Sequence, residues 1–239
     1  MNALPTPTLV IIPAYNEAEN LAPTVAELRA ACPDAAVIVV NDGSRDGTAA
    51  AARALDVVVL THPVNLGAGG SAQTGFRYAL THGFAAAVQH DADGQHDPRF
   101  IAPLAAALAA GEADVIIASR YARPGGFRAS VARRLGSWLF STLTSVLAGQ
   151  RFTDVTSGQR AYNVRAMRLL AGNFPTQFPD AEAILAMKKA GLRLRELAVT
   201  MRPRRAGKSK TTPGRALWYP ATALVAVFVE ALRRRYPAP

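Results

Sequence analysis

The polar sequence HDADGQHDP, residues 90–98, is the most promising place for chemistry in this chain. It follows the apolar run of residues 85–89 and brings together three carboxylates, two imidazoles and an amide. Asp91 and Asp93 are two residues apart, so an extended backbone places both carboxylates on one side. Two anions held this close need either a shared proton or a cation.

A divalent metal ion suits Asp91 and Asp93 better than acid–base catalysis does. Acid–base catalysis needs two groups that bracket a substrate bond, and residues at i and i+2 seldom do so. Mg²⁺ and Mn²⁺ prefer oxygen ligands, often one or two carboxylates together with substrate phosphates. His96 is either a further ligand or a hydrogen-bonding support. Asp97 stands directly before Pro98 and is expected to be a helix N-cap.

These side chains must be positioned by the elements around them, and the first half of the chain alternates between strands and helices. Continuous β-branched runs predict buried strands at 8–13, 35–42, 56–61, 85–91 and 113–120. Ala-rich and Leu-rich segments predict helices at 17–31, 46–55, 69–83 and 97–111. The alternation predicts an α/β fold, with a Rossmann-like, mostly parallel sheet flanked by helices. Ligands of such sheets bind beyond the carboxyl ends of the strands, where PAYNE, NDGSRDGT and HDADGQH are found.

The second half of the chain is less regular and strongly basic. Helices are predicted at 131–149, 166–172 and 181–191, a strand at 192–204 and a basic loop at 202–215. Residues 1–120 carry 6 Lys or Arg against 12 Asp or Glu, whereas residues 121–239 carry 21 against 5. This excess is either a basic solvated face or a C-terminal extension that meets anions such as phosphates or an anionic membrane.

The composition narrows the possible classes of function. The 239 residues, half of them hydrophobic, are enough for one large α/β domain or a domain with an appendage. A single cysteine excludes an internal disulfide and fits a reducing cytoplasm. The N-terminus shows no pattern of a signal peptide. Nucleic acid is not an expected partner, because the basic residues are not interleaved with stacking aromatics.

The glycine-rich sequence GAGGSA, residues 67–72, offers a rival interpretation as a dinucleotide-binding fingerprint, with Asp91 at about the required distance. However, Gly67 lies six residues past the end of its strand, whereas the fingerprint turn leaves the strand directly. The motif also belongs to the third strand–helix unit, and Asp93 has no role in that scheme. The pattern therefore favours the metal interpretation.

Seven motifs in order resemble glycosyltransferase family 2, whose members have the GT-A fold. The nucleotide-sugar half is matched by VIIPAYNE (10–17), VVNDGSRDGT (39–48), NLGAGGSAQTGF (65–76) and HDADGQHDP (90–98). The later motifs ASRY (118–121), TDVTSGQRAYN (153–163) and RRAGKSK (204–210) are similar to dolichyl-phosphate mannose synthase and bacterial polyprenyl-phosphate sugar transferases. Two positions depart from the family pattern: Asn41 replaces an acidic residue, and Ala118 replaces a glycine.

The resemblance implies a set of site residues. The nucleotide-sugar donor would be bound by Pro13, Ala14, Tyr15, Glu17, Asp42, Gly69, Asp91, Ala92 and Asp93. A divalent metal, Mg²⁺ or Mn²⁺, would be bound by Asp91, Asp93 and Gln95. Acceptor or donor phosphate would be bound by Arg120, Arg133, Arg134, Ser137, Arg204 and Lys210. The catalytic set implied is Asp91, Asp93, Gln95, Arg120 and Asp154.

The implied reaction is transfer of a sugar, with inversion, from a UDP- or GDP-sugar to a polyprenyl phosphate. A metal ion and basic side chains would stabilise the charge that develops on the leaving diphosphate. The alternative acceptor is a saccharide or protein hydroxyl in glycan synthesis. A hydroxyl needs a general base, for which Asp154, Asp180 and Glu182 are candidates. Two structural roles stay open: Asp154 as the partner of Arg160, and Glu182 as a first-turn helix acid.

The C-terminal segment 216–239 is expected to be an interfacial helix that follows a catalytic domain at 1–215. Its apolar run at 217–229 contains Pro220 and is shorter than the about 20 residues of a spanning helix. Trp218 and Tyr219 at one end and a run of arginines, 233–235, at the other are typical of a helix at a membrane surface. The alternative is packing on the domain or in a homodimer. The expected location is the cytoplasm, at the inner face of the cell membrane.

Overall fold

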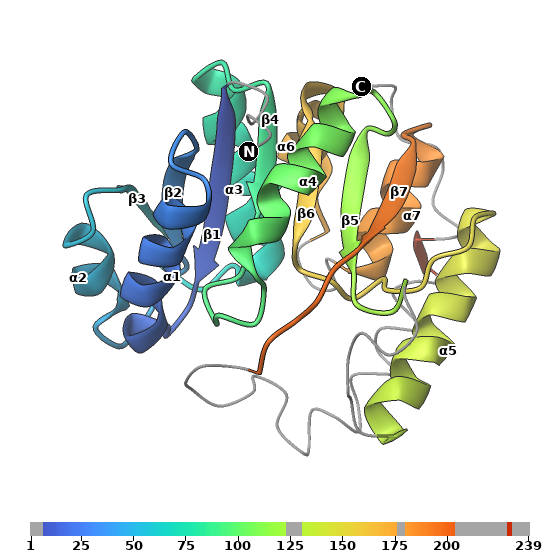
Figure 1. The fold of residues 1–239 in the computed structure, drawn as a ribbon, viewed down its shortest axis with the longest axis horizontal. Helices are drawn as coiled ribbons and strands as arrows, with labels where there is room; N and C mark the ends of the chain where they lie inside the picture. The colour runs from blue at the N-terminus through green and yellow to red at the C-terminus, as the bar shows by residue number, and fades with distance from the viewer. Residues whose placement is uncertain (1–6, 123–130, 176–179, 204–228, 231–239) are drawn as a thin grey trace.

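The computed structural model describes residues 7–122, 131–175, 180–203 and 229–230. The described residues form a seven-stranded sheet in the order β3-β2-β1-β4-β6-β5-β7 (Figure 1). The strands are β1 (Thr8–Ala14), β2 (Ala36–Asn41), β3 (Val58–Thr61), β4 (Ala86–Gln89), β5 (Val115–Ser119), β6 (Arg160–Asn163) and β7 (Leu194–Ala198). All neighbours pair in parallel except β6, which runs antiparallel to both β4 and β5. The predicted α/β class with a mostly parallel sheet is confirmed.

Helices cover both faces of the sheet. They are α1 (Ala18–Ala31), α2 (Thr48–Arg53), α3 (Gly67–Thr81), α4 (Ile101–Ala109), α5 (Val131–Ala148), α6 (Val164–Asn173) and α7 (Ala181–Lys189), with a 3₁₀ turn, η1 (Pro98–Phe100), before α4. Helices α1, α2 and α4 pack on one face, and α3, α6 and α7 pack on the other (Figure 1). Helix α5 packs against α7 beyond the β7 edge of the sheet.

The apolar runs form strands because both of their faces are buried. In β1, Leu9 and Ile11 enter the core beneath α3, whereas Val10 and Ile12 enter the core beneath α1 and α4. All four side chains are fully buried. A strand with two buried faces has no polar positions to alternate with its apolar ones, which explains its continuous hydrophobic sequence.

The reversed strand β6 determines which loops meet at the site. The parallel strands all end at the lower edge of the sheet in Figure 1, and β6 begins there at Arg160. The loop that precedes β6, residues 149–159, therefore joins the loops that follow β1, β2, β4, β5 and β7. The sequence analysis did not predict β6. Its four residues include Arg160 and Asn163, so no apolar run marks it.

Several sequence predictions fall on residues that the structure does not describe. Arg204, Lys210 and the domain boundary at 215/216 lie outside the described residues, and so does most of the segment 216–239. Arg133 and Arg134 belong to α5, but the positions of their side chains are not described. Within the described ranges, no helix combines the length and hydropathy that crossing a membrane requires.

Asp114 anchors the edge of the sheet opposite to the carboxyl ends. Its carboxylate accepts hydrogen bonds from the Arg193 backbone N–H (2.8 Å) and the Asn163 amide (2.9 Å), and Arg165 lies 3.3 Å away. Burial alone would raise the pKa of Asp114, yet these donors outweigh it and hold the pKa below its usual value. One buried carboxylate thus joins the ends of β5, β6 and β7.

Replacing Asp114 with asparagine is expected to lower the free energy of unfolding at pH 7 by about 1–3 kcal/mol, because the donors around this buried carboxylate lose their charged acceptor. A carboxyl with a depressed folded-state pKa stabilises the protein above its unfolded pKa and loses that contribution as the pH falls through the folded value. The difference from wild type should therefore shrink below about pH 4. Urea unfolding at several pH values measures it. Asp34→Asn, at an exposed position, is the control, and an equal loss in both variants would contradict the assignment.

Candidate active site

The loops that follow β1 and β2 are fixed to each other by hydrogen bonds. Asn16, at a positive φ of 54°, accepts a hydrogen bond from the Arg45 backbone N–H at 2.9 Å. The backbone N–H of the buried Glu17 donates to the Thr48 hydroxyl at 2.8 Å. Ala14 is buried at the end of β1, and Pro13 and Tyr15 on either side of it are partly exposed. The predicted nucleoside-binding residues Pro13, Ala14, Tyr15 and Glu17 thus stand on a fixed turn at the carboxyl edge.

Asp42 fastens the start of α3 to the end of β2. Its carboxylate accepts hydrogen bonds from the backbone N–H groups of Leu66 and Gly67, both at 2.8 Å, and lies 2.8 Å from His62 Nδ1. The carboxylate is buried at the N-terminus of α3, where an anion is favourable to the helix dipole. Gly69 is buried in the first turn of the same helix. A contact between Asp42 and a nucleoside stays a prediction.

The first histidine of the loop after β4 is a structural residue. His90 is buried, and its Nδ1 lies 3.1 Å from the side-chain nitrogen of Gln159. Burial, aided by nearby His96, lowers the pKa of His90 to about 3. The imidazole is therefore neutral, and its Nδ1 accepts the hydrogen bond from the Gln159 amide. This bond ties the loop after β4 to the start of β6.

Asp91 and Asp93 stand in a tight turn that holds their backbones in place. The Asp93 carboxylate accepts a hydrogen bond from the Gln95 N–H at 3.0 Å, and the Ala92 carbonyl accepts one from the Thr24 hydroxyl at 2.9 Å. Asp93 is buried, whereas the Asp91 side chain is 37% exposed. One Asp91 oxygen lies 3.5 Å from His96 Nε2, and the buried Nδ1 of His96 has no hydrogen-bond partner in the described part of the chain.

The chemistry of this turn fits a hard divalent cation. Asp91 and Asp93 offer carboxylate oxygens and Gln95 offers an amide oxygen, which are the ligand types that Mg²⁺ and Mn²⁺ prefer. Among the residues that the structure describes, no three His, Cys, Asp or Glu side chains gather into a group that could hold a metal by themselves. The hypothesis from the sequence, in which donor phosphates share the ion with Asp91 and Asp93, is compatible with this partial set.

Gly158 determines the position of the Asp91 carboxylate. A Cβ added at Gly158 would lie 2.3 Å from the Asp91 Oδ2 atom, closer than any real contact. A side chain at position 158 would therefore have to displace this carboxylate, and the glycine lets the loop before β6 lie against it. Gly158 does not have a positive φ, so its close contact with Asp91, and not the backbone conformation, accounts for a glycine in TSGQ.

Gly158→Ala is expected to weaken metal-dependent nucleoside diphosphate binding by about tenfold or more, because the added methyl group displaces a proposed ligand. Titration calorimetry with GDP and UDP in the presence of Mn²⁺ measures the change. Gly172→Ala is the matched control, since nothing lies within 4 Å of a Cβ at that position in α6. Unchanged binding in Gly158→Ala would remove Asp91 from the metal site or show that its carboxylate moves aside freely.

Asp97 caps η1, as the sequence predicts, and also joins the metal loop to the chain beyond β7. Its side chain accepts a hydrogen bond from the Arg99 backbone N–H at 3.0 Å. Arg202 lies 3.0 Å from both Asp97 and Glu27, and its backbone N–H donates to the Gln95 carbonyl at 2.8 Å. Burial opposes the ionisation of Asp97, but the bonds from Arg99 and the charge of Arg202 lower its pKa to about 2. Residues 201–203, which lead to the RRAGKSK motif, thus lie directly beside the metal loop.

Arg120 and Asp154 form a buried, two-pronged ion pair. Arg120 donates from Nε and from Nη2 to the two Asp154 oxygens, both at 2.5 Å, and its backbone N–H donates to the same carboxylate at 3.0 Å. Asp154 is completely buried, and Arg120 is 12% exposed. Glu196 of β7 accepts hydrogen bonds from the Thr153 and Asp154 N–H groups at 2.7–2.9 Å. The end of β5, the loop before β6 and β7 are therefore held as one unit.

The structural interpretation that paired Asp154 with Arg160 is wrong, because Asp154 pairs with Arg120. Arg160 instead donates to the Ser157 and Val155 carbonyls and lies 4.0 Å from Asp180. Both arginines contact the loop before β6, but Arg120, directly after β5, bonds the Asp154 carboxylate, whereas Arg160 bonds backbone carbonyls. Glu182 occupies the first turn of α7, as expected for a residue that interacts with the helix dipole.

Asp180 is a carboxyl group whose protonation is strongly affected by its surroundings. Burial raises the pKa of Asp180 to about 6, with Arg160 and Arg120 opposing the shift and Asp91 and Asp154 adding to it. The Asp180 side chain is nevertheless 33% exposed to solvent. The charges of Asp91 and Arg120 both act on Asp180, which indicates that the metal loop and the Arg120–Asp154 pair face the same space.

Ser137 stands in α5, and its buried hydroxyl has no hydrogen-bond partner among the described residues.

Of the predicted site residues, Asp91, Asp93, Gln95, Arg120 and Asp154 lie together at one edge of the sheet. Arg204 and Lys210 lie outside the described residues.

Sequence reasoning missed four residues that shape this edge: Gly158, Gln159, Glu196 and Arg202. Glu196 had a detectable signal, because it shares a strand face with the core residue Leu194 and is therefore a carboxylate on an apolar face. Arg202 had none, because its partners Glu27 and Asp97 are more than a hundred residues away in the chain.

The family model described as Glycosyl transferase family 2 matches residues 9–170, which include the motifs after β1, β2, β4 and β5. The chain belongs to glycosyltransferase family 2. This glycosyltransferase is 36% identical over 216 residues to an undecaprenyl-phosphate mannosyltransferase of Micrococcus luteus, covering 86% of this chain and 88% of that protein. It is 42% identical over 162 residues to a polyprenol monophosphomannose synthase of Mycolicibacterium smegmatis, covering 65% of this chain and 61% of that protein.

Solved structures confirm the fold of this family 2 glycosyltransferase. A mannosyltransferase from Pyrobaculum calidifontis, solved with GDP-Man and Mn²⁺, aligns with a TM-score of 0.67 and 21% identity. The alignment covers 97% of this chain and 65% of that one. The predicted family, its α/β fold and its activity as a glycosyltransferase are confirmed.

Proposed function

We propose that this glycosyltransferase transfers a sugar, with inversion, from a UDP- or GDP-sugar to a polyprenyl phosphate, with Mg²⁺ or Mn²⁺ as cofactor. The observation that carries the proposal is the meeting of the Asp91/Asp93 turn and the buried Arg120–Asp154 pair at one edge of the sheet. The names of the relatives from Micrococcus and Mycolicibacterium support the lipid phosphate acceptor. The Pyrobaculum mannosyltransferase, solved with GDP-Man and Mn²⁺, supports a divalent metal.

The donor side uses the loops after β1, β2 and β4. The turn at Pro13–Glu17 and the loop at 42–48 are proposed to receive the nucleoside, and Gly69 and Ala92 to contact the donor. Asp91, Asp93 and Gln95 would hold the metal. When bound, a divalent ion neutralises the negative charge that develops on the leaving diphosphate. The protein's own contribution is rigidity: Gly158, Thr24 and Arg202 fix the metal loop before the donor arrives.

The acceptor side is cationic. Arg120, Arg133, Arg134, Ser137, Arg204 and Lys210 are proposed to bind phosphate. A phosphate monoester is already an anion at neutral pH, so the nucleophile needs no general base. Asp154 then acts as a positioning residue, which holds the Arg120 guanidinium at a fixed place through two hydrogen bonds. The C-terminal segment 216–239, proposed as a unit separate from the catalytic domain 1–215, would keep the enzyme at the inner face of the membrane.

A hydroxyl acceptor is the second candidate, and Asp180 is the observation that favours it. With a pKa raised to about 6, Asp180 has a basicity suited to accepting a proton near neutral pH. This candidate requires that Asp180→Asn abolish transfer while nucleotide binding persists. With a phosphate acceptor, the same variant should retain most of its activity.

The test is a transfer assay with the purified full chain. GDP-mannose and a panel of UDP-sugars are each offered with undecaprenyl phosphate in detergent, in Mg²⁺, in Mn²⁺ and in chelator. We expect a lipid-linked sugar product in metal and none in chelator, and NMR of the product gives its anomeric configuration. The proposal would be overturned if no donor gave a lipid-linked sugar and the enzyme instead transferred a sugar to a saccharide hydroxyl.

A further inference from the structure

Helix α5 carries its apolar side chains on the outside of the molecule. Trp138 is 62% exposed, Leu139 48%, Val146 73% and Leu147 40%. These residues recur at the spacing of one helix face, with Leu143 partly buried between them. We call this set of residues, Trp138, Leu139, Val146 and Leu147, the outer face of α5.

The inner face of α5 carries hydroxyl groups that bond to the loop before β6. The Ser145 hydroxyl accepts a hydrogen bond from the Phe152 N–H at 2.8 Å, and the Ser141 hydroxyl donates to the Thr153 carbonyl at 3.3 Å. Thr144 between them is fully buried. A surface helix ordinarily turns its apolar stripe to the core and its polar side to water. In α5, Phe140, Leu143 and Ala148 pack on the core, yet four more apolar side chains face outwards, while Ser141 and Ser145 hold the loop that leads into Asp154.

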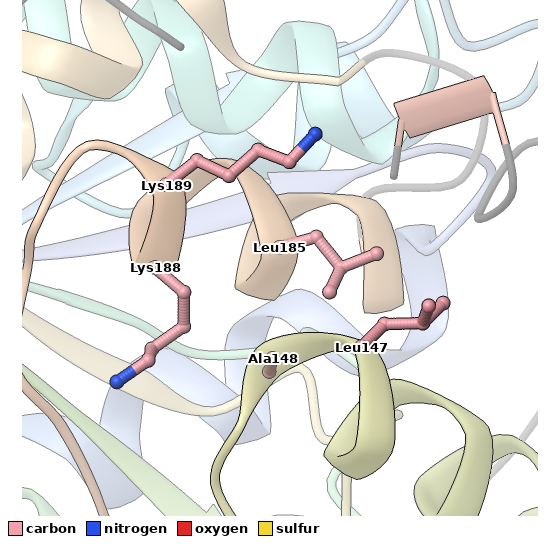
Figure 2. A pocket seen from close by; sticks show the side chains of 5 residues that line it. All are labelled: Leu147, Ala148, Leu185, Lys188 and Lys189. Carbon is pink, nitrogen blue, oxygen red and sulfur yellow. The ribbon is translucent and has the colours of Figure 1, made fainter. Parts of the chain in front are cut away.

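Basic residues stand in the first turn of α5 and in the last turn of the neighbouring α7. The sequence of α5 contains Arg133 and Arg134 in its first turn and no acidic residue anywhere. At its other end, Leu147 and Ala148 line a pocket of about 240 Å³ with Leu185, Lys188 and Lys189 of α7. Figure 2 shows Leu147 and Leu185 facing the same space, with the two lysines of the last turn of α7 beside it.

We propose that the outer face of α5 docks on the surface of an anionic lipid membrane. The inference rests on the proposed function, since a polyprenyl phosphate must be taken from a bilayer. Exposed Trp and aliphatic side chains with flanking cations are what an anionic interface binds. A second copy of this chain suits the surface poorly, because pairing two α5 helices would bring their cations together with no acidic residue of the helix to neutralise them. Docking by α5 would hold the loop at 152–154, and so Arg120, next to the lipid headgroups.

The first test measures sedimentation with vesicles of equal parts phosphatidylglycerol and phosphatidylcholine. We expect the double variant Leu139→Glu/Val146→Glu to lose at least about tenfold in partitioning, because two apolar anchors become anions. Val58→Glu, which charges an exposed valine on the opposite edge strand β3, is the matched control and should bind as wild type does. Equal binding by all three proteins would overturn the proposal.

A second measurement leaves the outer face intact and so does not depend on how the charged variant folds. The chain has two tryptophans, and Trp218→Phe leaves Trp138 as the remaining one. Its emission should shift to the blue on addition of the vesicles and be quenched by brominated lipid tails. Unquenched, unshifted emission in a sample that sediments with vesicles would show that another part of the chain binds them and would overturn the proposal.

A third readout separates this inference from the proposed function. A water-soluble, short-chain isoprenyl phosphate should be glycosylated equally well by wild type and by the double variant, whereas undecaprenyl phosphate in vesicles should be used at least about tenfold faster by wild type. Equal use of the vesicle acceptor by both proteins refutes docking by α5 and leaves the function standing. No transfer to either acceptor by wild type refutes the function. Sedimentation equilibrium showing a wild-type dimer that the double variant loses, without vesicle binding, would assign the face to a second copy.

Discussion

Asp91→Asn is expected to lower the metal-dependent affinity for nucleoside diphosphate at least about a hundredfold and to abolish sugar transfer. The substitution keeps the shape of the side chain and removes its charge, so the 3.5 Å approach of His96 and the contact with Gly158 can persist. Only the attraction for a cation is lost. Asp93→Asn should behave alike, since its oxygen continues to accept the Gln95 N–H hydrogen bond.

Titration calorimetry with GDP and UDP, in Mn²⁺ and in chelator, measures the effect. Wild type should bind the nucleotide much more tightly in Mn²⁺, and the Asp91 variant should bind equally weakly in both. Asp56→Asn, which neutralises a fully exposed carboxylate between α2 and β3, is the control for a lost negative charge. If Asp91→Asn keeps the Mn²⁺ dependence of wild type, the metal lies elsewhere.

Asp154→Ala is expected to remove about 3–5 kcal/mol from the free energy of unfolding, because the buried Arg120 guanidinium loses its partner. For a chain of this size that corresponds to a melting temperature lower by roughly 10 °C. Transfer should be lost, because the guanidinium no longer has a fixed position. The exposed pair Arg29–Asp56 provides the control, and Asp56→Ala should leave the melting temperature nearly unchanged.

A double variant separates stability from catalysis at this pair. Arg120→Met/Asp154→Leu removes both charges and fills the space with apolar atoms, which often restores the stability of a buried ion pair. We expect its melting temperature to return towards that of wild type while transfer stays absent. Recovery of both properties would show that the pair serves the fold alone, and Arg120 would no longer be assigned to phosphate.

The sequence predicted the parts of this fold that local chemistry determines. The run at 8–13 is continuous and β-branched, so it could be recognised as a strand with two buried faces, and Asp97 before Pro98 could be recognised as a cap. Asp91 and Asp93 could be assigned to a metal because two neighbouring carboxylates limit each other's chemistry. In each case the information lies within a few residues.

Contacts across the chain could not be predicted in the same way. The sequence suggested Arg160 as the partner of Asp154, and only the arrangement of β6 beside β5 in the sheet brings Arg120 to it instead. The strand β6 escaped notice because Arg160 and Asn163 occupy its ends. The face that α5 turns outwards was also unpredictable, because its serines are needed by a loop that the helix pattern does not include.

The late position of β7 has a consequence for how the protein is made on the ribosome. Strand β7 pairs along the whole length of β5 and brings Glu196 and Arg202 to loops formed some forty to a hundred residues earlier. Until it emerges, the nascent chain presents β5, which is apolar except for Ser119, as an open sheet edge, and such edges pair readily with strands of other molecules. A truncated gene product that ends near residue 170 would retain most of the family's signature motifs, yet it would be prone to aggregate and would lack the strand that completes the catalytic edge.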